Sequence, residues 1–259
     1  MTTKSLTYQS ESFSASRLGL LIRMHILSSY RSWLTTGAVA AGLILIASML
    51  SGPDNTGFYL AALTNIVIFI GVYFTSRSFR ELHDKTKNES YLLIPASAFE
   101  KTLARLLVST VGFIISAFSF VFIVSILSEL IKPLLFGPKL PIFNPFRIES
   151  LELIKFYLFI QSIYFLGAAW FKNNHLIKTL LAQLIIVIGL ALFAFIVVLI
   201  AFEPYIGANL DFSIEVEQFP KDFMTSIEPL AKLGMALLTV ACWAIAWMKV
   251  KETEVSEGV

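Results

Sequence analysis

Six long apolar stretches, separated by polar or turn-forming segments, set the pattern of this 259-residue chain. Each is close to the roughly 20 apolar residues that a helix needs to cross a bilayer. They are too long for strands and lack the alternation of apolar and polar residues typical of membrane barrels. The pattern predicts an all-α membrane protein with six transmembrane helices, at residues 33–51, 58–74, 106–127, 151–171, 180–202 and 230–248.

The basic residues indicate the orientation, because Lys and Arg concentrate in cytoplasmic loops. With the N-terminus inside, the inner segments hold 14 of the 20 Lys and Arg residues, and the outer segments hold ten of the 18 acidic ones. We therefore expect an N-in, C-in membrane protein. It divides into a cytoplasmic N-terminus at 1–32, a transmembrane domain at 33–248 and a cytoplasmic tail at 249–259.

Composition supports a membrane location and argues against other classes. The chain is 56% hydrophobic and 15% charged, against about 25% charged in a soluble domain. Its mean hydropathy is +0.76. The net charge of +2 comes from dispersed basic residues, so we expect no nucleic-acid partner. The single cysteine, Cys242, excludes an internal disulfide and reads as a buried hydrophobe.

The N-terminal segment does not read as a cleaved signal peptide, because residues 1–13 are polar. Residues 14–32 mix basic and apolar side chains, which predicts a helix lying along the inner membrane surface before the first span. The apolar stripe of Leu18, Leu21, Ile22 and Ile26 is imperfect, since Leu20, Met24 and Leu27 fall on other faces of the helix.

Two outer loops are expected. Residues 129–150 contain four prolines, which predicts an irregular segment lying against the outer surface. Residues 203–229 could hold a short helix or a re-entrant hairpin, interrupted by Pro204, Gly207 and Pro220.

The first cytoplasmic loop, residues 76–105, carries the clearest local signals. The i,i+4 pairs Arg80/Asp84 and Glu81/Lys85 favour a short helix. Pro95 then interrupts regular helix. Ser97 and Glu100 form the Ser-x-x-Glu pattern of a capping box, which predicts the start of the third helix. Lys101 and Arg105 follow at headgroup level, so the loop is expected to be ordered.

Two interpretations of this loop remain open. Any polytopic protein needs a basic inner loop, and this one could simply be long. Alternatively, the apolar residues 91–94 between charged stretches could form a docking surface for a soluble partner. The candidate docking residues are Arg80, Glu81, His83, Asp84, Tyr91, Leu92, Leu93, Ile94 and Pro95.

The same run resembles a known family. The pattern FRELHDK, YLLIPAS, EK and R between residues 79 and 105 resembles the first cytoplasmic loop of six-span permease subunits of ABC-2-type ATP-binding-cassette transporters, of the small Bacteroidetes type. The resemblance extends to PIFNPF at 141–146 and to residues 161–181. It implies a permease of an exporter in the bacterial cytoplasmic (inner) membrane, whose N-terminal helix and first loop contact a separate ATPase subunit. It also implies a second permease copy or homologue around a transport path.

No residue pattern for catalysis on this chain is apparent. The sequence has no G-x-x-x-x-G-K-[ST] phosphate loop, so ATP and Mg²⁺ would bind only to a partner ATPase. His25, His83 and His175 are isolated in the sequence and lack the spacing of metal ligands. We therefore expect a protein that is not an enzyme and carries no cofactor or metal of its own.

The span interiors hold no Asp, Glu, Lys or Arg, which argues against proton- or sodium-coupled transport. Their polar side chains are expected to form interhelical hydrogen bonds. A sharper hypothesis is that Asn65 and Gln161 line a path for an apolar or amphipathic substrate. The alternative function is a non-transporting membrane scaffold or accessory subunit, which the residues alone leave open.

Overall fold

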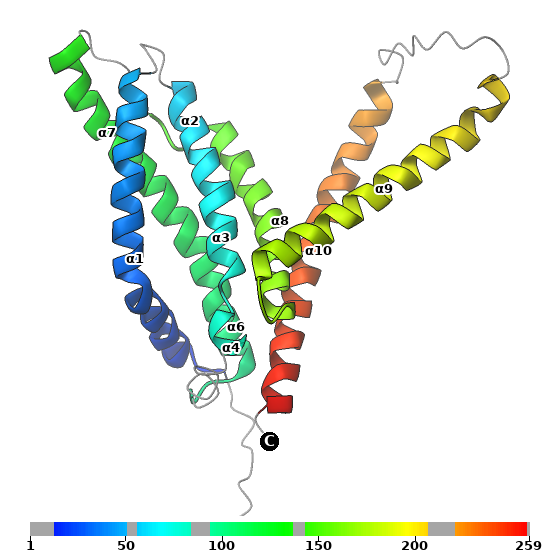
Figure 1. Ribbon diagram of the computed structural model, residues 1–259, viewed down its shortest axis with the longest axis horizontal. Helices are drawn as coiled ribbons and strands as arrows, with labels where there is room; N and C mark the ends of the chain where they lie inside the picture. Colours follow the sequence, from blue (N-terminus) through cyan, green and yellow to red (C-terminus); the bar gives the residue numbers. More distant parts are fainter. Residues whose placement is uncertain (1–12, 51–55, 84–93, 137–142, 207–220, 258–259) are drawn as a thin grey trace, which may run out of the picture.

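The computed structural model describes residues 13–50, 56–83, 94–136, 143–206 and 221–257. The described part is helical almost throughout and contains no strand. Its helices, labelled in Figure 1, are α1 (Ala15–Leu50), α2 (Thr56–Asn65), α3 (Gly71–Ser76), α4 (Arg80–His83), α6 (Ala98–Leu107), α7 (Phe113–Phe136), α8 (Ile148–Trp170), α9 (His175–Ile206) and α10 (Lys221–Glu257).

Two short π-helical turns join consecutive α-helices into longer rods. The turn η1 (Ile66–Ile70) connects α2 to α3, and η2 (Val108–Gly112) connects α6 to α7. With these turns included, six helical stretches are long and apolar enough to cross a membrane. The prediction of an all-helical protein with six helices long and apolar enough to cross a membrane is confirmed. The stretches are Trp33–Leu50, Gly57–His83, Ala98–Ile131, Ile148–Trp170, His175–Val197 and Glu228–Val255.

The N-terminal region differs from the expectation of a separate surface helix. α1 is one helix of 36 residues that runs from Ala15 through the first span without a break. The physical reason lies in the sequence between Gly19 and Gly37, which contains no proline or glycine to end a helix. In Figure 1 the first turns of α1 nevertheless lean away from the axis of the rest of the helix.

The segments predicted to be outer loops are also more helical than expected. α7 continues past residue 129 to Phe136 with Pro133 inside it, so the prediction of an irregular segment beginning at 129 is wrong. α9 likewise runs past Pro204 to Ile206, and α10 contains Pro229. A proline removes only one hydrogen bond, whereas leaving the helix in an apolar environment would strand several backbone groups. Glu129 therefore lies within a helix, where it is buried.

Two apolar clusters hold the helices together. The first joins α2, η1, α7 and α8 around Tyr59, Leu63, Phe113 and Tyr157. The second joins α4, α8 and α10 at the other end, around Phe79, Leu82, Phe165, Ala168, Ala169, Ala246 and Val250. α8 belongs to both clusters and packs most extensively against α10, so it is the central helix of the bundle.

α9 is the least packed of the candidate spans. The apolar window of its candidate span, within His175–Val197, contains no buried residue, and in Figure 1 α9 diverges from α1, α2 and α7. Its described contacts are chiefly with α8 at its first turns. There Gly167 of α8 comes so close to Thr179 of α9 that a side chain at Gly167 would lie within 2.9 Å of the Thr179 Cβ and Cγ2 atoms.

Gly167 therefore offers a test of the α8–α9 contact. We expect Gly167→Ala to destabilise the protein by about 1–3 kcal/mol, because the added methyl group overlaps a side chain held by its own hydrogen bond to His175. Adding Thr179→Ala should partly restore stability. Gly189→Ala, which meets nothing within 4 Å, is the matched control and should leave the melting temperature in detergent nearly unchanged. Equal melting temperatures for Gly167→Ala and the control would contradict the contact.

Candidate functional site: the loop end of the bundle

The capping box predicted for the third helical rod is present at the start of α6. The Glu100 backbone N–H donates to Ser97 Oγ at 3.2 Å, and the Ser97 N–H donates to Glu100 Oε2 at 3.0 Å. These two bonds satisfy backbone donors that the first turn of a helix leaves open. The segment after Pro95 is thus fixed by local chemistry, as the sequence predicts.

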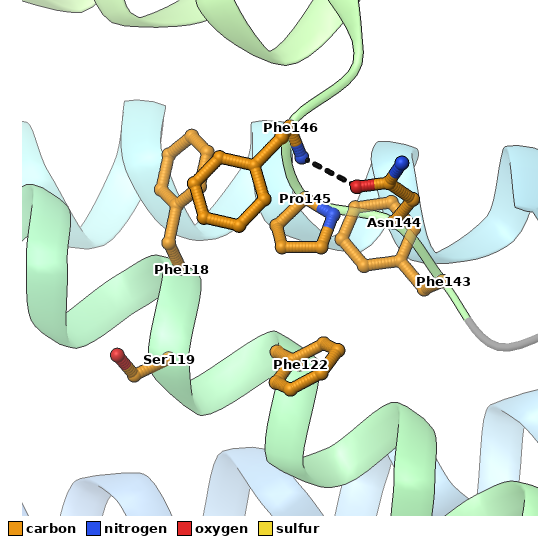
Figure 2. Close-up of a pocket in the computed structure, with 7 residues that line it drawn as sticks. All are labelled: Phe118, Ser119, Phe122, Phe143, Asn144, Pro145 and Phe146. Carbon is orange, nitrogen blue, oxygen red and sulfur yellow. Dashed lines mark hydrogen bonds between the residues drawn. The ribbon is translucent and has the colours of Figure 1, made fainter.

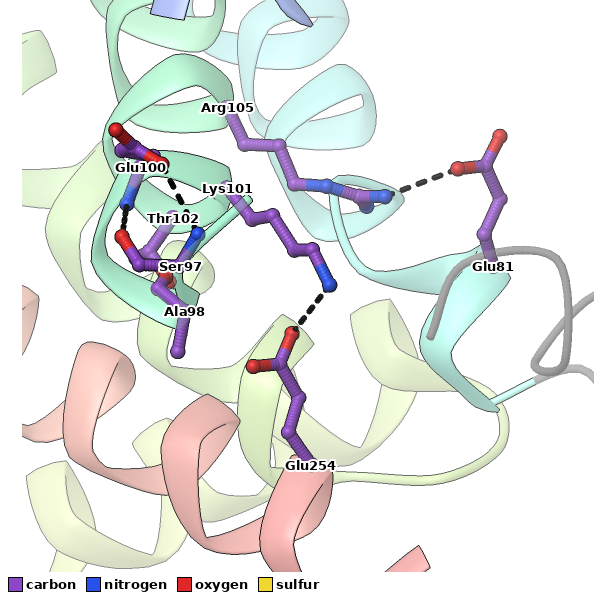
Figure 3. A network of polar contacts seen from close by, with 8 residues as sticks. All are labelled: Glu81, Ser97, Ala98, Glu100, Lys101, Thr102, Arg105 and Glu254. Carbon is purple, nitrogen blue, oxygen red and sulfur yellow. Dashed lines mark hydrogen bonds and ion pairs between the residues drawn. The ribbon is translucent and has the colours of Figure 1, made fainter. Parts of the chain in front are cut away.

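α6 also carries three ion pairs, each to a different helix. Glu100 Oε1 accepts from Arg17 of α1 at 3.2 Å and from the Ser14 N–H at 2.7 Å. The other two pairs, drawn in Figure 3, are Lys101 with Glu254 of α10 at 3.1 Å and Arg105 with Glu81 of α4 at 2.9 Å. We call these three pairs the α6 charge cluster, and the end of the bundle that holds it the loop end.

The α6 side chains of this cluster face inward, which the sequence did not predict. Glu100, Lys101 and Arg105 are at most 5% exposed. The expectation that Lys101 and Arg105 lie at headgroup level concerns their depth in the membrane and stays a prediction. Carboxylates of α10 and α4 pair with these two cations. The Arg105 guanidinium also lies 5.3 Å from the centre of the Phe79 ring. Paired in this way, the buried charges avoid most of the desolvation cost that an isolated one would carry.

His25 of α1 lies beside the same cluster. Burial, with a smaller contribution from the nearby Arg105 and a partial opposition from Glu81, lowers its pKa to about 4. The imidazole is therefore neutral at pH 7 and adds no positive charge. The three acidic and three basic side chains of the α6 charge cluster then balance. Their α6 members are buried, whereas the side chains of Arg17 and Glu81 are 32% and 44% exposed.

The predicted docking residues take different positions. Arg80 is exposed at the start of α4, and Pro95 is exposed beyond it. Glu81 points to Arg105, and Ile94 packs against the Phe79 cluster rather than standing free. Asp84, Tyr91, Leu92 and Leu93 lie outside the described residues, as does Lys85, so the expected i,i+4 pairs of α4 do as well.

Two histidines that are isolated in the sequence meet at the loop end. The rings of His83 and His175 stack with their centres 5.2 Å apart, and His83 Nε2 lies 3.2 Å from the Ala168 carbonyl oxygen. This contact ties α4 to the turn between α8 and α9. No group of three or more potential metal-binding side chains is present among the residues that the structure describes.

Gln161, one of the two proposed path residues, is the centre of a buried polar chain. Its Nε2 donates to Ser109 Oγ at 3.0 Å, and its Oε1 accepts from Trp243 Nε1 at 3.0 Å. The Tyr157 hydroxyl donates to the Ser109 carbonyl at 2.6 Å. A π-helical turn shifts the backbone hydrogen bonds of a helix by one residue. Here the carbonyl that accepts from Tyr157 of α8 belongs to Ser109 of η2. The chain of bonds links α8, η2 and α10.

Asn65 lies in a different setting. It is exposed on the surface of the single chain at the end of α2, and its Nδ2 donates to the Ala61 carbonyl at 2.9 Å. Gln161 is fully buried. The two residues proposed to share a path therefore differ in access in this conformation.

An aromatic pocket lies at the end of the bundle away from the loop end. Figure 2 shows rings from α7 and from the segment before α8 around a cavity of about 520 Å³. Asn144 closes a local turn by accepting the Phe146 N–H at 2.9 Å. The lining carries no charged side chain and consists of Phe118, Ser119, Phe122, Phe143, Asn144, Pro145 and Phe146. Such a recess suits an apolar group.

Sequence reasoning missed several residues of the loop end. Glu254 belongs to the stretch expected to be a cytoplasmic tail, yet α10 reaches Glu257 and buries Val250. Its partner Lys101 is far away in the sequence, so no local pattern joins them. The only signal available was the apolar spacing of Ala246 and Val250, which continues the inner face of the last span by one helical turn.

Comparisons with known proteins found no matching family model, no similar curated protein and no similar solved structure.

The Lys101–Glu254 pair can be tested against a surface pair on the same helix. We expect Glu254→Gln to destabilise the protein by about 2–3 kcal/mol, because it removes the carboxylate beside a buried ammonium group. Glu252→Gln breaks the exposed pair with Lys249 and should cost less than about 1 kcal/mol. Thermal unfolding of the two purified variants in detergent measures the difference. Equal losses would show that the buried pair contributes no more than a surface one.

Proposed function

We propose that this chain is the permease subunit of an ABC-2-type ATP-binding-cassette transporter, working as an exporter. It would couple ATP hydrolysis on a separate ATPase subunit to the movement of a substrate across the membrane. The six candidate spans suit a permease. The motifs that resemble this family lie between residues 79 and 105, at 141–146 and at 161–181, and residues 143–146 of the second motif line the aromatic pocket. In this proposal the chain is not itself an enzyme.

The observation that carries the proposal is the α6 charge cluster. Its pairs fasten the start of α6 to α4, to the start of α1 and to the end of α10. A force applied to α4 or to residues 94–97 would therefore act on the helices of four candidate spans at once, because breaking a buried ion pair is strongly destabilising. A partner that changes shape on ATP hydrolysis could use this connection.

The proposed orientation follows from the basic residues. Six spans return the chain to its starting side, so the N- and C-termini share one compartment. The excess of Lys and Arg in the segments at this end favours the cytoplasm. The loop end would then face the cytoplasm of a bacterium, where the ATPase and its ATP and Mg²⁺ are found.

The remaining partners proposed are the lipid membrane and a second permease copy or homologue, with no nucleic acid. The packing of α9 agrees with a further membrane partner, because its apolar window has no buried residues within one chain. A path between two copies could include the exposed Asn65. Gln161 could join it only if the buried polar chain opened during transport.

The docking proposal predicts a complex that depends on the first loop. Affinity purification at native expression levels should recover an ATP-binding-cassette ATPase in a fixed ratio to this chain. Replacing Tyr91, Leu92 and Leu93 by Ser should remove the ATPase, because an apolar contact would be lost. Ile94 is kept, because it packs against the chain's own Phe79 cluster. The measurement is quantitative mass spectrometry of the eluate.

The matched control is Asn173→Ser in the exposed turn between α8 and α9 at the same end, which should leave the ATPase bound. Full recovery of the ATPase with the serine variant would contradict docking through this loop. Recovery of an unrelated membrane complex without any ATPase would favour the scaffold function instead.

The path proposal is tested separately. Asn65→Ala and Gln161→Ala should lower substrate-stimulated ATPase activity of the reconstituted complex while leaving the basal activity in place. Gln161→Ala should also lower the melting temperature, because Ser109 and Trp243 lose their shared partner. If both variants keep normal stimulation and transport, neither residue lines the path.

A further inference from the structure

A narrow cavity lies between α1, α7 and the rod formed by α2, η1 and α3. Its volume is about 230 Å³. The lining runs from Trp33 to Ala40 on α1, from Ile66 to Phe74 on the rod and from Phe113 to Phe120 on α7. At a rise of 1.5 Å per residue, each of these segments makes the cavity roughly 11 Å long. We call this elongated space the α1–α7 cavity.

Both π-helical turns border this cavity. Ile66 and Ile70 of η1 line it, and Phe113 of the lining directly follows η2. A π-helical turn inserts one extra residue, which shifts the side chains after it out of the α-helical register, and such turns are frequent at functional sites. The cavity therefore lies where the regular register of two helical rods is interrupted.

The walls of the α1–α7 cavity are apolar and aromatic. The rings of Trp33 and Phe74 meet edge to face with their centres 4.7 Å apart, and Phe74 stacks with Phe113 at 6.1 Å. On the α1 side Gly37 leaves space, because a Cβ atom there would approach Phe120 only to 3.9 Å. The lining carries no charged side chain. The interior therefore suits an apolar chain.

A cation lies at the loop end of this cavity. Arg77 follows Tyr73 of the lining by four residues, its Nη1 donates to the Tyr73 hydroxyl, and its guanidinium lies 5.3 Å from the centre of the Tyr73 ring. Arg77 is exposed, and within the described part of the chain no carboxylate pairs with it. A guanidinium has five N–H donors, so those that Tyr73 does not use can bind an anion.

We propose that the α1–α7 cavity binds a single-chain amphiphile with a carboxylate head, the chemistry of a fatty acid. The tail lies along the cavity toward Ala40, and Arg77 binds the head. The volume is below the roughly 300–1,000 Å³ of sites for drug-sized ligands, so the cavity accepts one chain rather than the two of a phospholipid. One guanidinium matches a single negative charge and can pair with a carboxylate through two hydrogen bonds. The inference concerns this chain alone and does not depend on the proposed transport function.

The test uses the full-length protein in phosphatidylcholine nanodiscs at pH 8. The probe is dodecanoate with a photoreactive diazirine in its tail, and mass spectrometry identifies the peptides to which it becomes attached. We expect cross-links to concentrate in residues 33–40, 66–74 and 113–120 and to decrease when unlabelled dodecanoate is added in excess. Labelling that spreads evenly over the apolar surface, α9 included, and does not respond to the unlabelled acid would overturn the proposal.

Filling the cavity should block the probe. Gly37→Leu places a side chain in the space beside Phe120 and should abolish the labelling that unlabelled dodecanoate displaces. Ala40→Leu, on the same wall, is a second filling variant that should act in the same direction. The matched control is Gly42→Leu on the same helix, where a Cβ atom meets nothing within 4 Å and which does not line the cavity. Unchanged labelling in the filling variants would show that the probe binds elsewhere.

Charge variants test the position of the head. Arg77→Gln should weaken dodecanoate binding by roughly ten-fold, because a charge-assisted hydrogen bond is lost. Binding of the uncharged probe, dodecanol with the same diazirine, should not change. Arg80→Gln, at an exposed arginine of the same end, is the control and should leave both probes bound. An equal loss for acid and alcohol, or no loss for either, would overturn the assignment of the carboxylate to Arg77.

Discussion

The buried charges of α6 constrain the structure more than any other interaction at the loop end. Three charged side chains of one short helix lie in a site with little water, and each pairs with a different helix. An ionised group in such a site is costly unless an opposite charge is correctly placed. The start of α1, the helix α4 and the end of α10 must therefore take up one arrangement together. Because Lys101 pairs with Glu254, the last turns of α10 belong to the folded bundle rather than to a tail.

Within the membrane-spanning part, polar and steric contacts replace the hydrophobic effect as the source of specificity. Lipid tails are as apolar as leucine, so apolar side chains alone do not decide which helices meet. The bonds from Gln161 to Ser109 and Trp243 select α8, η2 and α10 as neighbours. The close approach at Gly167 places α9 against α8. Beyond this contact α9 has few partners within the chain, which leaves its apolar surface to lipid or to another protein.

The loop end and the interior are mechanically connected. α6 continues through η2 into α7, and η2 is the turn that Tyr157 and Gln161 contact. A movement of α6 would therefore displace the buried polar chain around Gln161. Through α7 it would also displace the aromatic pocket at the other end of the bundle. In the proposed transporter this route would join the docking surface to the transport path.

The sequence by itself determined the features that depend on nearby residues. Apolar runs of about 20 residues specify helices that can cross a bilayer, and Ser97 with Glu100 specifies a capped helix start, because these hydrogen bonds form within four residues along the chain. Pro133 does not end α7, although its presence predicted an irregular segment. One lost hydrogen bond costs less than ending a helix in an apolar environment, and this balance depends on surroundings that the sequence does not specify. Only the tertiary structure decided that Lys101 and Arg105 face inward, that Glu81 pairs across helices and that His83 meets His175. These contacts join residues distant in the sequence, so they exist only once α8 and α10 have packed and fixed which helix faces are buried.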